Sequence, residues 1–199
     1  MNRIATIGTM LAAALLATGC GTQPQNSSEP PLAGAKIGGP FTLTDQDGKT
    51  VHDSDFAGKY RLVYFGYTFC PDICPTDMQH VGQGLRILEK SDPALAARVV
   101  PIFITVDPAR DTPAVLKQFV SSFHPRMVGL TGSQPAIDAV AKEFAIVHEA
   151  QPRAPGTTGY LVDHSRQTYL MSPDGKPLAL VRADESGEAV AEDVRKWAK

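Results

Sequence analysis

The sequence predicts an α/β fold with a central mixed sheet flanked by helices and an N-terminal β-hairpin. Three observations lead to this prediction. Apolar runs of strand type alternate with segments whose apolar residues recur at helical spacing, which is typical of right-handed βαβ crossovers. The run 61–66 is short, apolar and aromatic, and the run 99–106 is almost continuously β-branched and aromatic, as in strands that are buried on both faces. Near its end, the chain has two further strand-like runs and an amphipathic helix.

The elements expected along the chain follow from apolar spacing and from start and turn signals. Asp47-Gly48 marks the turn of the first hairpin, and Pro173-Asp174-Gly175-Lys176 marks the turn of the last one. Asp111-Thr112-Pro113 gives a capping residue and a first-turn proline, and Ser133 with Pro135 does the same for a later helix. The expected strands are 38–44, 50–51, 61–66, 99–106, 127–131, 160–162, 168–171 and 178–181, and the expected helices are 76–90, 113–123, 133–144 and 190–197.

Two cysteines stand where the first main strand passes into the helix that follows it. They lie in the stretch Tyr64-Phe65-Gly66-Tyr67-Thr68-Phe69-Cys70-Pro71-Asp72-Ile73-Cys74-Pro75. In open α/β sheets, functional sites belong at the carboxyl ends of strands, which is where this pair falls. A βαβ start with reactive cysteines in this place, followed by a closing hairpin and helix, amounts to a thioredoxin-like layout.

The local sequence predicts reactive thiols but leaves their use open. Asp72 is expected as the N-cap of the helix, which puts Cys74 and Pro75 in its first turn. The unpaired N–H groups and the dipole at a helix start stabilise anions, so we expect one or both thiols to ionise more easily than a free cysteine. Residues four apart on a helix are within reach of a disulfide and also of one shared metal ion. A static disulfide and two inert buried thiols are the structural alternatives.

The amino terminus is predicted to direct the protein to a membrane rather than to join the fold. Residues 1–19 combine Arg3, an apolar stretch too short for a comfortable transmembrane helix, and small residues before Cys20. This resembles a bacterial lipoprotein signal in which Cys20 carries the lipid, with an ordinary secretory signal as the alternative. Residues 20–36, rich in Pro, Ser, Gln and Gly, are expected to form a flexible tether, and residues 37–199 the domain.

Export has consequences for location and for the cysteines. We expect a lipid-anchored protein of the inner membrane whose domain faces the periplasm or the outside, where thiols tend to be oxidised. With Cys20 lipidated, the pair Cys70 and Cys74 is left for chemistry. The formal charge of −2, without any Lys/Arg run, gives no support to nucleic-acid binding.

Five motifs, spread over most of residues 38–182, together resemble the Sco/SenC family. This family consists of copper-binding thioredoxin-like proteins that help to assemble the binuclear copper site of cytochrome c oxidase. The pair Arg166-Gln167 is more polar than the pair found there in many members. The motifs are the cysteine stretch from Tyr64 to Pro75, Gly39-Pro40-Phe41-Thr42-Leu43, Thr105-Val106-Asp107-Pro108-Ala109-Arg110-Asp111-Thr112, Gly129-Leu130-Thr131-Gly132 and Val162-Asp163-His164-Ser165.

The resemblance implies that Cys70, Cys74 and His164 hold one copper ion, Cu(I) or Cu(II). Two thiolates and one imidazole are a soft, three-donor set that suits Cu(I), whereas a structural zinc site would normally need a fourth protein ligand. Met78, one turn after Cys74, is a soft thioether, but a methionine at helical spacing is usually core filler. Asp163 is able to orient His164 or to approach the metal, with a simple turn residue as the alternative.

His164 is also the histidine that its position in the sequence favours. It falls in a polar loop between two strand-like runs, with Asp163 beside it. His80 lies roughly 240° around the helix from Cys74, and His148 begins the strand or loop after a helix. The two others, with no spacing argument in their favour, are His52 and His124.

The resemblance predicts a copper metallochaperone that passes copper to the copper-binding subunit of cytochrome c oxidase, with a periplasmic copper chaperone as a further partner. The alternative is a thiol:disulfide oxidoreductase that keeps cysteines of the oxidase or of a copper chaperone reduced. The sequence therefore leaves open whether the protein is an enzyme. A peroxidase, suggested by Thr68 two residues before Cys70, has no evident need for His164.

Overall fold

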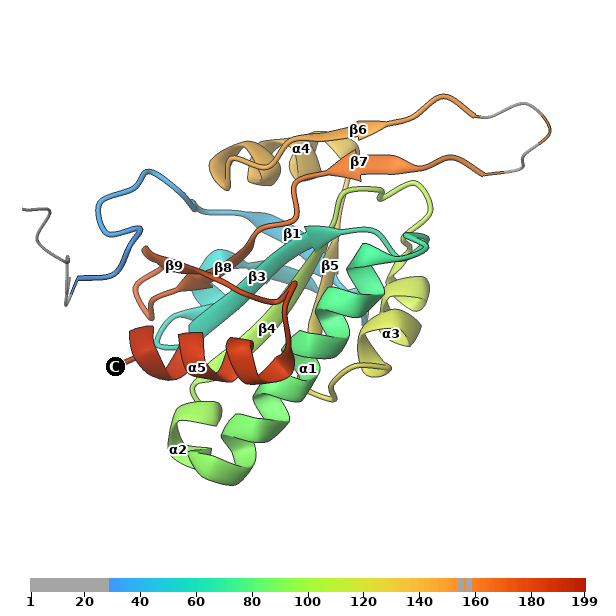
Figure 1. The fold of residues 1–199 in the computed structure, drawn as a ribbon. Coiled ribbons are helices and arrows are strands. Elements are labelled where there is room, and N and C mark those ends of the chain that lie inside the picture. Colours follow the sequence, from blue (N-terminus) through green and yellow to red (C-terminus); the bar gives the residue numbers. More distant parts are fainter. Residues whose placement is uncertain (1–28, 154–155, 157–158) are drawn as a thin grey trace, which may run out of the picture.

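The computed structural model describes residues 29–153, 156 and 159–199, and in this part of the chain a seven-stranded sheet has the order β2-β1-β5-β4-β3-β8-β9 (Figure 1). Strands β3, β4 and β5 run parallel, whereas β8 pairs antiparallel with β3 and β9. The hairpin β1–β2 joins antiparallel to β5. The strands are β1 (Thr42–Asp45), β2 (Thr50–His52), β3 (Tyr60–Gly66), β4 (Val99–Thr105), β5 (Val128–Thr131), β8 (Thr168–Met171) and β9 (Pro177–Val181). The predicted thioredoxin-like fold with an N-terminal hairpin is confirmed.

Helices cover both faces of this sheet (Figure 1). Successive residues of β3 point to opposite faces. The Tyr64 hydroxyl donates to Asp77 of α1, while the ring of Phe65 lies 5.3 Å from the ring of Phe144 at the end of α4. Phe103 pairs with both Tyr64 and Phe119, which puts α3 on the α1 face. The helices are α1 (Ile73–Ser91), α2 (Pro93–Ala96), α3 (Pro113–Ser121), α4 (Gln134–Glu143) and α5 (Gly187–Trp197), and Asp53–Phe56 forms the 3-10 turn η1.

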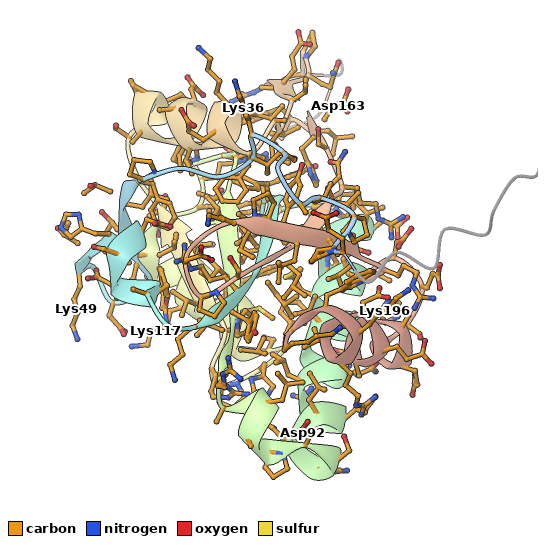
Figure 2. All side chains as sticks on the ribbon, turned by 90° about the vertical axis from the view of Figure 1, so that its left-hand side faces the viewer. Lys36, Lys49, Asp92, Lys117, Asp163 and Lys196 are labelled. Carbon is orange, nitrogen blue, oxygen red and sulfur yellow. The ribbon has the colours of Figure 1, made fainter. Side chains whose placement is uncertain are left out.

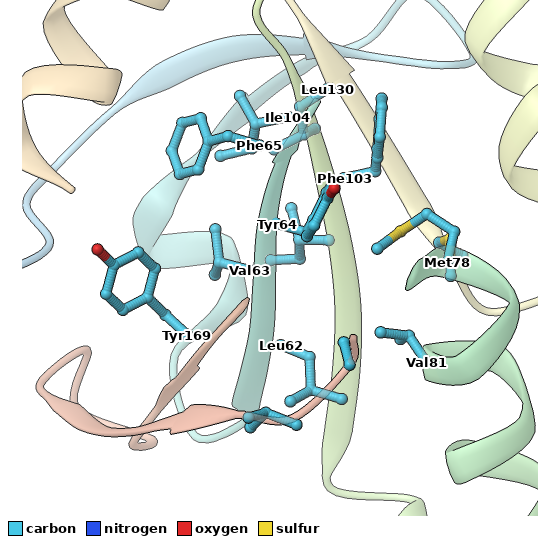
Figure 3. Packing of buried hydrophobic residues seen from close by; sticks show 14 of the residues in the cluster. Leu62, Val63, Tyr64, Phe65, Met78, Val81, Phe103, Ile104, Leu130 and Tyr169 are labelled. Carbon is cyan, nitrogen blue, oxygen red and sulfur yellow. The ribbon is translucent and has the colours of Figure 1, made fainter. Parts of the chain in front are cut away.

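The core is centred on β3 and β4. All seven residues of β3 are buried, as its nearly continuous apolar run predicts for a central strand covered on both faces. Figure 3 shows Leu62 and Tyr64 of β3 facing α1, from which Met78 points toward the sheet. Burial of each large side chain of this kind contributes about 1.5–3 kcal/mol to folding, so β3 is held firmly where the cysteine turn begins.

The helices begin near the residues predicted from the sequence, but not every predicted capping residue makes a capping hydrogen bond. The side chains of Thr112 and Ser133 accept hydrogen bonds from the backbone N–H groups of Val115 and Ala136 and so cap α3 and α4. Asp72 occupies the N-cap of α1, as predicted, but its side chain makes no capping hydrogen bond. Asp111, which precedes Thr112, is buried and belongs to a different network.

A separate two-stranded ribbon carries His164. Strand β6 (His148–Ala150) pairs antiparallel with β7 (Val162–His164), and the register sets His148 opposite His164. The ribbon lies outside the main sheet (Figure 1). The expectation that His164 lies in a polar loop is therefore wrong, because His164 ends a strand. The sequence predicted a strand at 160–162 and a strand or loop from His148, but strands of three residues that mix polar and apolar side chains have no clear period, so the bounds of β7 were misplaced.

Residues 29–36 contact the domain. The N–H of Leu32 donates to the carbonyl of Leu178 at 3.0 Å, and the Leu32 side chain packs against the core. Residues 29–36, which the sequence assigns to the predicted tether, thus lie against the domain in the structure. The predicted signal at 1–19, the lipidation site Cys20 and the tether up to residue 28 lie outside the described residues. Within the described part of the chain, no helix combines the length and the hydropathy that a membrane span requires.

Candidate metal centre

The two cysteines lie in the turn after β3 and in the first turn of α1. The N–H of Cys70 donates to the Tyr67 carbonyl at 3.2 Å, which closes the turn. The N–H of Cys74 donates to the sulfur of Cys70 at 3.4 Å, so a backbone group at the helix start faces this thiol. Both cysteines are free thiols in the structure. The pair thus lies at the carboxyl end of β3, as the sequence predicts.

Gly66, the last residue of β3, makes room for Cys74. A Cβ atom at this position would lie 2.9 Å from the Cys74 sulfur and 2.8 Å from the Tyr64 ring. Real Cβ atoms almost never approach other atoms so closely, so any larger residue here must displace the sulfur or the ring. The glycine is therefore part of the construction of the site.

His164 brings the third donor from the ribbon. Its Nε2 atom lies 3.2 Å from the sulfur of Cys74. The sulfur atoms of Cys70 and Cys74 and one ring nitrogen of His164 all lie within 4.8 Å of one another. The structure thus brings together the three residues that the sequence singled out as metal ligands.

The hydrogen bond on the far side of the His164 ring determines which nitrogen can bind a metal. Nδ1 lies 3.0 Å from the backbone carbonyl of Ser165, which can only accept. Burial lowers the pKa of His164, with the Ser165 carbonyl acting in the opposite direction, which favours the neutral ring. Nδ1 therefore carries the proton, and Nε2 directs its lone pair toward Cys74.

Cys74 does not have the acidic thiol that its place at a helix start predicts. Its exposed fraction is 0% and burial raises its pKa, while the backbone of Tyr67 acts in the opposite direction. In this case desolvation outweighs the helix dipole, because the sulfur lies in the core rather than in water. The prediction of easier ionisation is wrong for Cys74. Its neutral S–H can instead donate to Nε2 of His164.

Two tyrosines surround the imidazole. The rings of Tyr64 and Tyr67 meet the His164 ring edge to face, with centroids 6.1 and 5.9 Å apart. Such contacts contribute about 0.5–1.5 kcal/mol beyond area burial and restrict rotation of the ring. The aromatic stretch before the cysteines therefore shapes the histidine side of the site as well.

One side of the centre is open to solvent. A surface hollow beside the cluster is lined by Tyr67, Ile73, Leu161 and two of the three donor residues, Cys70 and His164. Cys70 has an exposed fraction of 9%, whereas Cys74 is enclosed. A metal ion or an incoming ligand would therefore reach Cys70 and His164 first.

The other candidates for a ligand or for a residue that orients one lie outside the cluster of Cys70, Cys74 and His164. Asp163 is exposed, and its carboxylate accepts a hydrogen bond from Gln151, while His164 is oriented through Ser165. Figure 2 shows Asp163 at the end of the molecule opposite Asp92, the residue after α1. Met78 is buried in the core. The other histidines bind elsewhere: His52 to Thr42, His80 to the Ala183 carbonyl, His124 to Glu89 and His148 to Asp138.

The donor set fits a soft monovalent metal better than zinc. Among the described residues, Cys70, Cys74 and His164 form the only group of three or more His, Cys, Asp or Glu side chains with this geometry. A structural zinc site would need a fourth ligand, whereas two sulfurs and one imidazole suit Cu(I). The residues present therefore fit copper.

Two networks that support the site could not be predicted from the sequence. The buried carboxylate of Asp111 accepts hydrogen bonds from the Thr68 N–H, the Thr68 hydroxyl and the Thr105 hydroxyl, which ties the cysteine turn to the end of β4. The Thr68 hydroxyl, on which the peroxidase interpretation relied, is therefore hydrogen-bonded to Asp111. The guanidinium of Arg110 lies 3.7 Å from the centroid of the Tyr160 ring and 5.0 Å from that of Phe69. The motif from Thr105 to Thr112 was visible in the sequence, but not these contacts.

Comparisons with known proteins agree with this geometry. The profile of the family described as SCO1/SenC matches residues 29–199. Protein SenC of Rhodobacter capsulatus is 44% identical over 162 residues, which span 81% of this chain and 71% of that protein.

Solved structures are similar in fold as well as in sequence. ScoI of Bradyrhizobium japonicum, whose structure was determined with copper bound, is 40% identical, with a TM-score of 0.72 over 81% of this chain and 99% of that chain. BsSco, a member of the Sco family of cytochrome c oxidase assembly proteins in which a disulfide switch was identified, is 28% identical. Its TM-score is 0.62, over 84% of this chain and 94% of that chain.

Proposed function

The chain belongs to the SCO1/SenC family, and we therefore propose that it is a copper metallochaperone. In this proposal, it binds one copper ion through Cys70, Cys74 and His164 and delivers the ion to the binuclear copper site of cytochrome c oxidase during assembly. The copper-bound structure of ScoI and the oxidase-assembly role of the Sco family, to which BsSco belongs, support this assignment.

One observation supports the proposal above all others. Two sulfurs and an imidazole nitrogen, from segments 90 residues apart, converge within 4.8 Å. A protein that only exchanged disulfides would need the two cysteines and an acceptor, but no third donor from a separate ribbon. The convergence of His164 therefore favours metal binding over redox chemistry alone.

The open side of the site suits transfer by ligand exchange. Cys70 and His164 line the surface hollow, so a donor group of the recipient can approach them while the enclosed Cys74 still holds the ion. We infer that the copper-binding subunit of the oxidase docks over this hollow. A periplasmic copper chaperone that loads the site would need the same access.

The test is the copper stoichiometry of the purified chain after reduction under anaerobic conditions. We expect one Cu(I) per chain and a loss of stoichiometric binding when Cys70 and Cys74 are both replaced by serine. Binding of copper by the double variant at the wild-type ratio would contradict the proposal.

A second function is favoured by the arrangement of the two cysteines. The Cys74 N–H faces the sulfur of Cys70, and Cys70 is the more exposed of the two, so Cys70 is suited to attack. Its thiolate would form a bond to one sulfur of a target disulfide and release the other sulfur as a thiolate. Cys74 would then displace the target from Cys70, which leaves the target reduced by two electrons and the pair as a disulfide. Targets would be cysteines of the oxidase subunit or of a copper chaperone.

We also propose that Cys20 anchors the protein in the inner membrane and that the domain faces the periplasm or the outside. The support is the order of charged, apolar and small residues before Cys20. An anchor so close to the domain would keep the metal centre near an oxidase subunit in the same membrane.

A further inference from the structure

An ion pair with a buried carboxylate lies next to the candidate metal centre. The Arg166 guanidinium donates two hydrogen bonds to the Asp77 carboxylate, from Nε at 2.9 Å and from Nη2 at 2.6 Å. The Asp77 side chain is almost entirely buried, whereas the Arg166 side chain is 41% exposed. The hydroxyl of Tyr64 donates a third hydrogen bond to the same carboxylate at 3.0 Å. The buried carboxylate of Asp77 thus binds an arginine whose side chain is partly exposed to solvent.

The positions of the two residues relate this pair to the ligands. Asp77 lies three residues after Cys74 on α1, which puts both on one face of the helix. Arg166 lies two residues after His164. The ion pair and the contact between Cys74 and His164 therefore join the same two segments, one turn of helix apart.

The other bonds of the histidine segment lead away from α1. The Ser165 N–H donates to the Val147 carbonyl at 2.9 Å, and β7 pairs with β6. In the described part of the chain, the hydrogen bonds that link residues 162–167 to α1 are those between Arg166 and Asp77 and the contact between His164 and Cys74. Without the ion pair, the contact between His164 and Cys74 would be the one polar link left between the described residues 162–167 and α1.

We propose that Arg166 is a positioning residue, which holds the His164 segment against the cysteine helix by binding Asp77. The forked guanidinium gives this contact a direction as well as a charge. Burying a carboxylate costs free energy that pairing often fails to recover, so general stability is a weak reason for such a pair. Its place beside two ligands gives it a specific use, which is to set the distance between the His164 nitrogen and the Cys74 sulfur.

The first test compares two arginine variants in the reduced full-length protein. Arg166→Gln should weaken Cu(I) binding by about 10–100-fold, as is typical for groups that orient metal ligands. Arg182→Gln is the matched control, because Arg182 is 44% exposed and also binds a largely buried aspartate, Asp193. Arg182 lines one surface hollow together with Arg166, but its ion pairs go to Asp193, Glu185 and Glu192 and not to Asp77. Cu(I) affinity is measured by competition with a chromophoric chelator. Equal affinities for Arg166→Gln and wild type, or equal losses in the two variants, would overturn the proposal.

A double variant shows whether Arg166 acts through Asp77. Arg166→Gln leaves the carboxylate buried without its cation, which destabilises the fold, whereas Asp77→Asn/Arg166→Gln removes that charge. If the pair acts as one unit, Arg166→Gln has much less effect on Cu(I) affinity in the Asp77→Asn background than in the wild type. Strictly additive losses would show that Arg166 acts in another way.

The copper-dependent arm of this test rests on the proposed function, so a second measurement uses the protein without metal. In the copper-free, reduced wild type, the edge-to-face contact between His164 and Tyr67 predicts nuclear Overhauser effects between the two rings. These should weaken in Arg166→Gln and in the double variant but persist in Arg182→Gln. Unchanged ring contacts in folded Arg166→Gln would refute the positioning role. A wild type that binds no copper would instead contradict the proposed function.

Discussion

The Nε2 atom of His164 lies 3.2 Å from the sulfur of Cys74, although 90 residues of sequence separate them. The cysteine turn belongs to the main sheet and the histidine to the separate ribbon β6–β7. The candidate metal centre is therefore a junction between two parts of the fold, and its geometry depends on how firmly they are joined.

Replacing His164 should affect copper and little else. We expect His164→Ala to stay folded and to form the Cys70–Cys74 disulfide, but to bind copper at least tenfold more weakly and with a changed copper–thiolate absorption spectrum, because one of three donors is lost. His148→Ala is the control, since His148 lies opposite in the ribbon but bonds to Asp138. Wild-type affinity and spectrum in His164→Ala would mean that the third donor lies elsewhere.

Oxidation and copper binding should exclude each other. A disulfide between Cys70 and Cys74 removes both thiolate donors, so the oxidised protein should take up far less Cu(I) than the reduced protein. Conversely, one equivalent of Cu(I) should slow the reaction of the two thiols with a disulfide reagent. Parallel titrations of both redox forms measure this, and similar copper uptake by the two would contradict the shared use of the pair.

Gly66→Ala should disturb the position of the Cys74 sulfur. Its new methyl group would lie 2.9 Å from the Cys74 sulfur and must displace it or the Tyr64 ring. Overpacking of this kind typically costs about 1–3 kcal/mol in the free energy of unfolding. We expect a lower urea midpoint and weaker copper binding. In the control Gly132→Ala, the new methyl group would meet the flexible end of Leu43 at 3.1 Å and Ala136 at 3.6 Å, and none of the three ligand residues, so copper binding should be unchanged.

Stability without copper should fall as the pH decreases below about 6.5, in part through His124. Burial lowers the pKa of this histidine, although the Glu89 carboxylate opposes the shift and Arg126 and Arg86 add to it. In the unfolded chain, a histidine has its ordinary pKa of about 6.5. Below that pH the unfolded chain gains a proton that buried His124 resists, so the free energy of unfolding decreases.

His124→Gln removes this difference in proton uptake between the two states. The decrease in the urea midpoint from pH 7.5 to pH 5 should therefore be smaller for His124→Gln than for the wild type. Identical pH dependence of the two proteins would show that His124 does not contribute.

Cys20→Ser should release the protein from the membrane. If Cys20 carries the lipid, its replacement leaves nothing to hold the domain at the bilayer after signal cleavage. Fractionation of cells that express the two forms should find the wild type in the membrane pellet and the variant in the periplasmic or external soluble fraction. A variant that stays in the pellet after a salt wash would argue against a lipid anchor.

The sequence by itself determined those features that depend on neighbouring residues. Apolar runs such as 61–66 identify buried strands, because a strand covered on both faces needs apolar residues at nearly every position. Arg61, the charged member of this run, is paired with Asp53. The position of Cys70 and Cys74 at a strand-to-helix turn can also be predicted locally, because the strand and the helix are recognised from the residues directly before and after the pair. His164 is different, because only the family resemblance pointed firmly to the histidine that joins them.

The tertiary structure alone decided what depends on distant segments. The helix start favours an acidic Cys74, but burial under Gly66, Tyr64 and the ribbon raises its pKa, since desolvation depends on every segment that excludes water. Likewise, the polar Arg166 is readable in the sequence, while its pairing with Asp77 requires α1 and the histidine segment to meet. Local pattern encodes the elements, whereas electrostatics and ligand geometry arise from contacts between residues far apart in the chain.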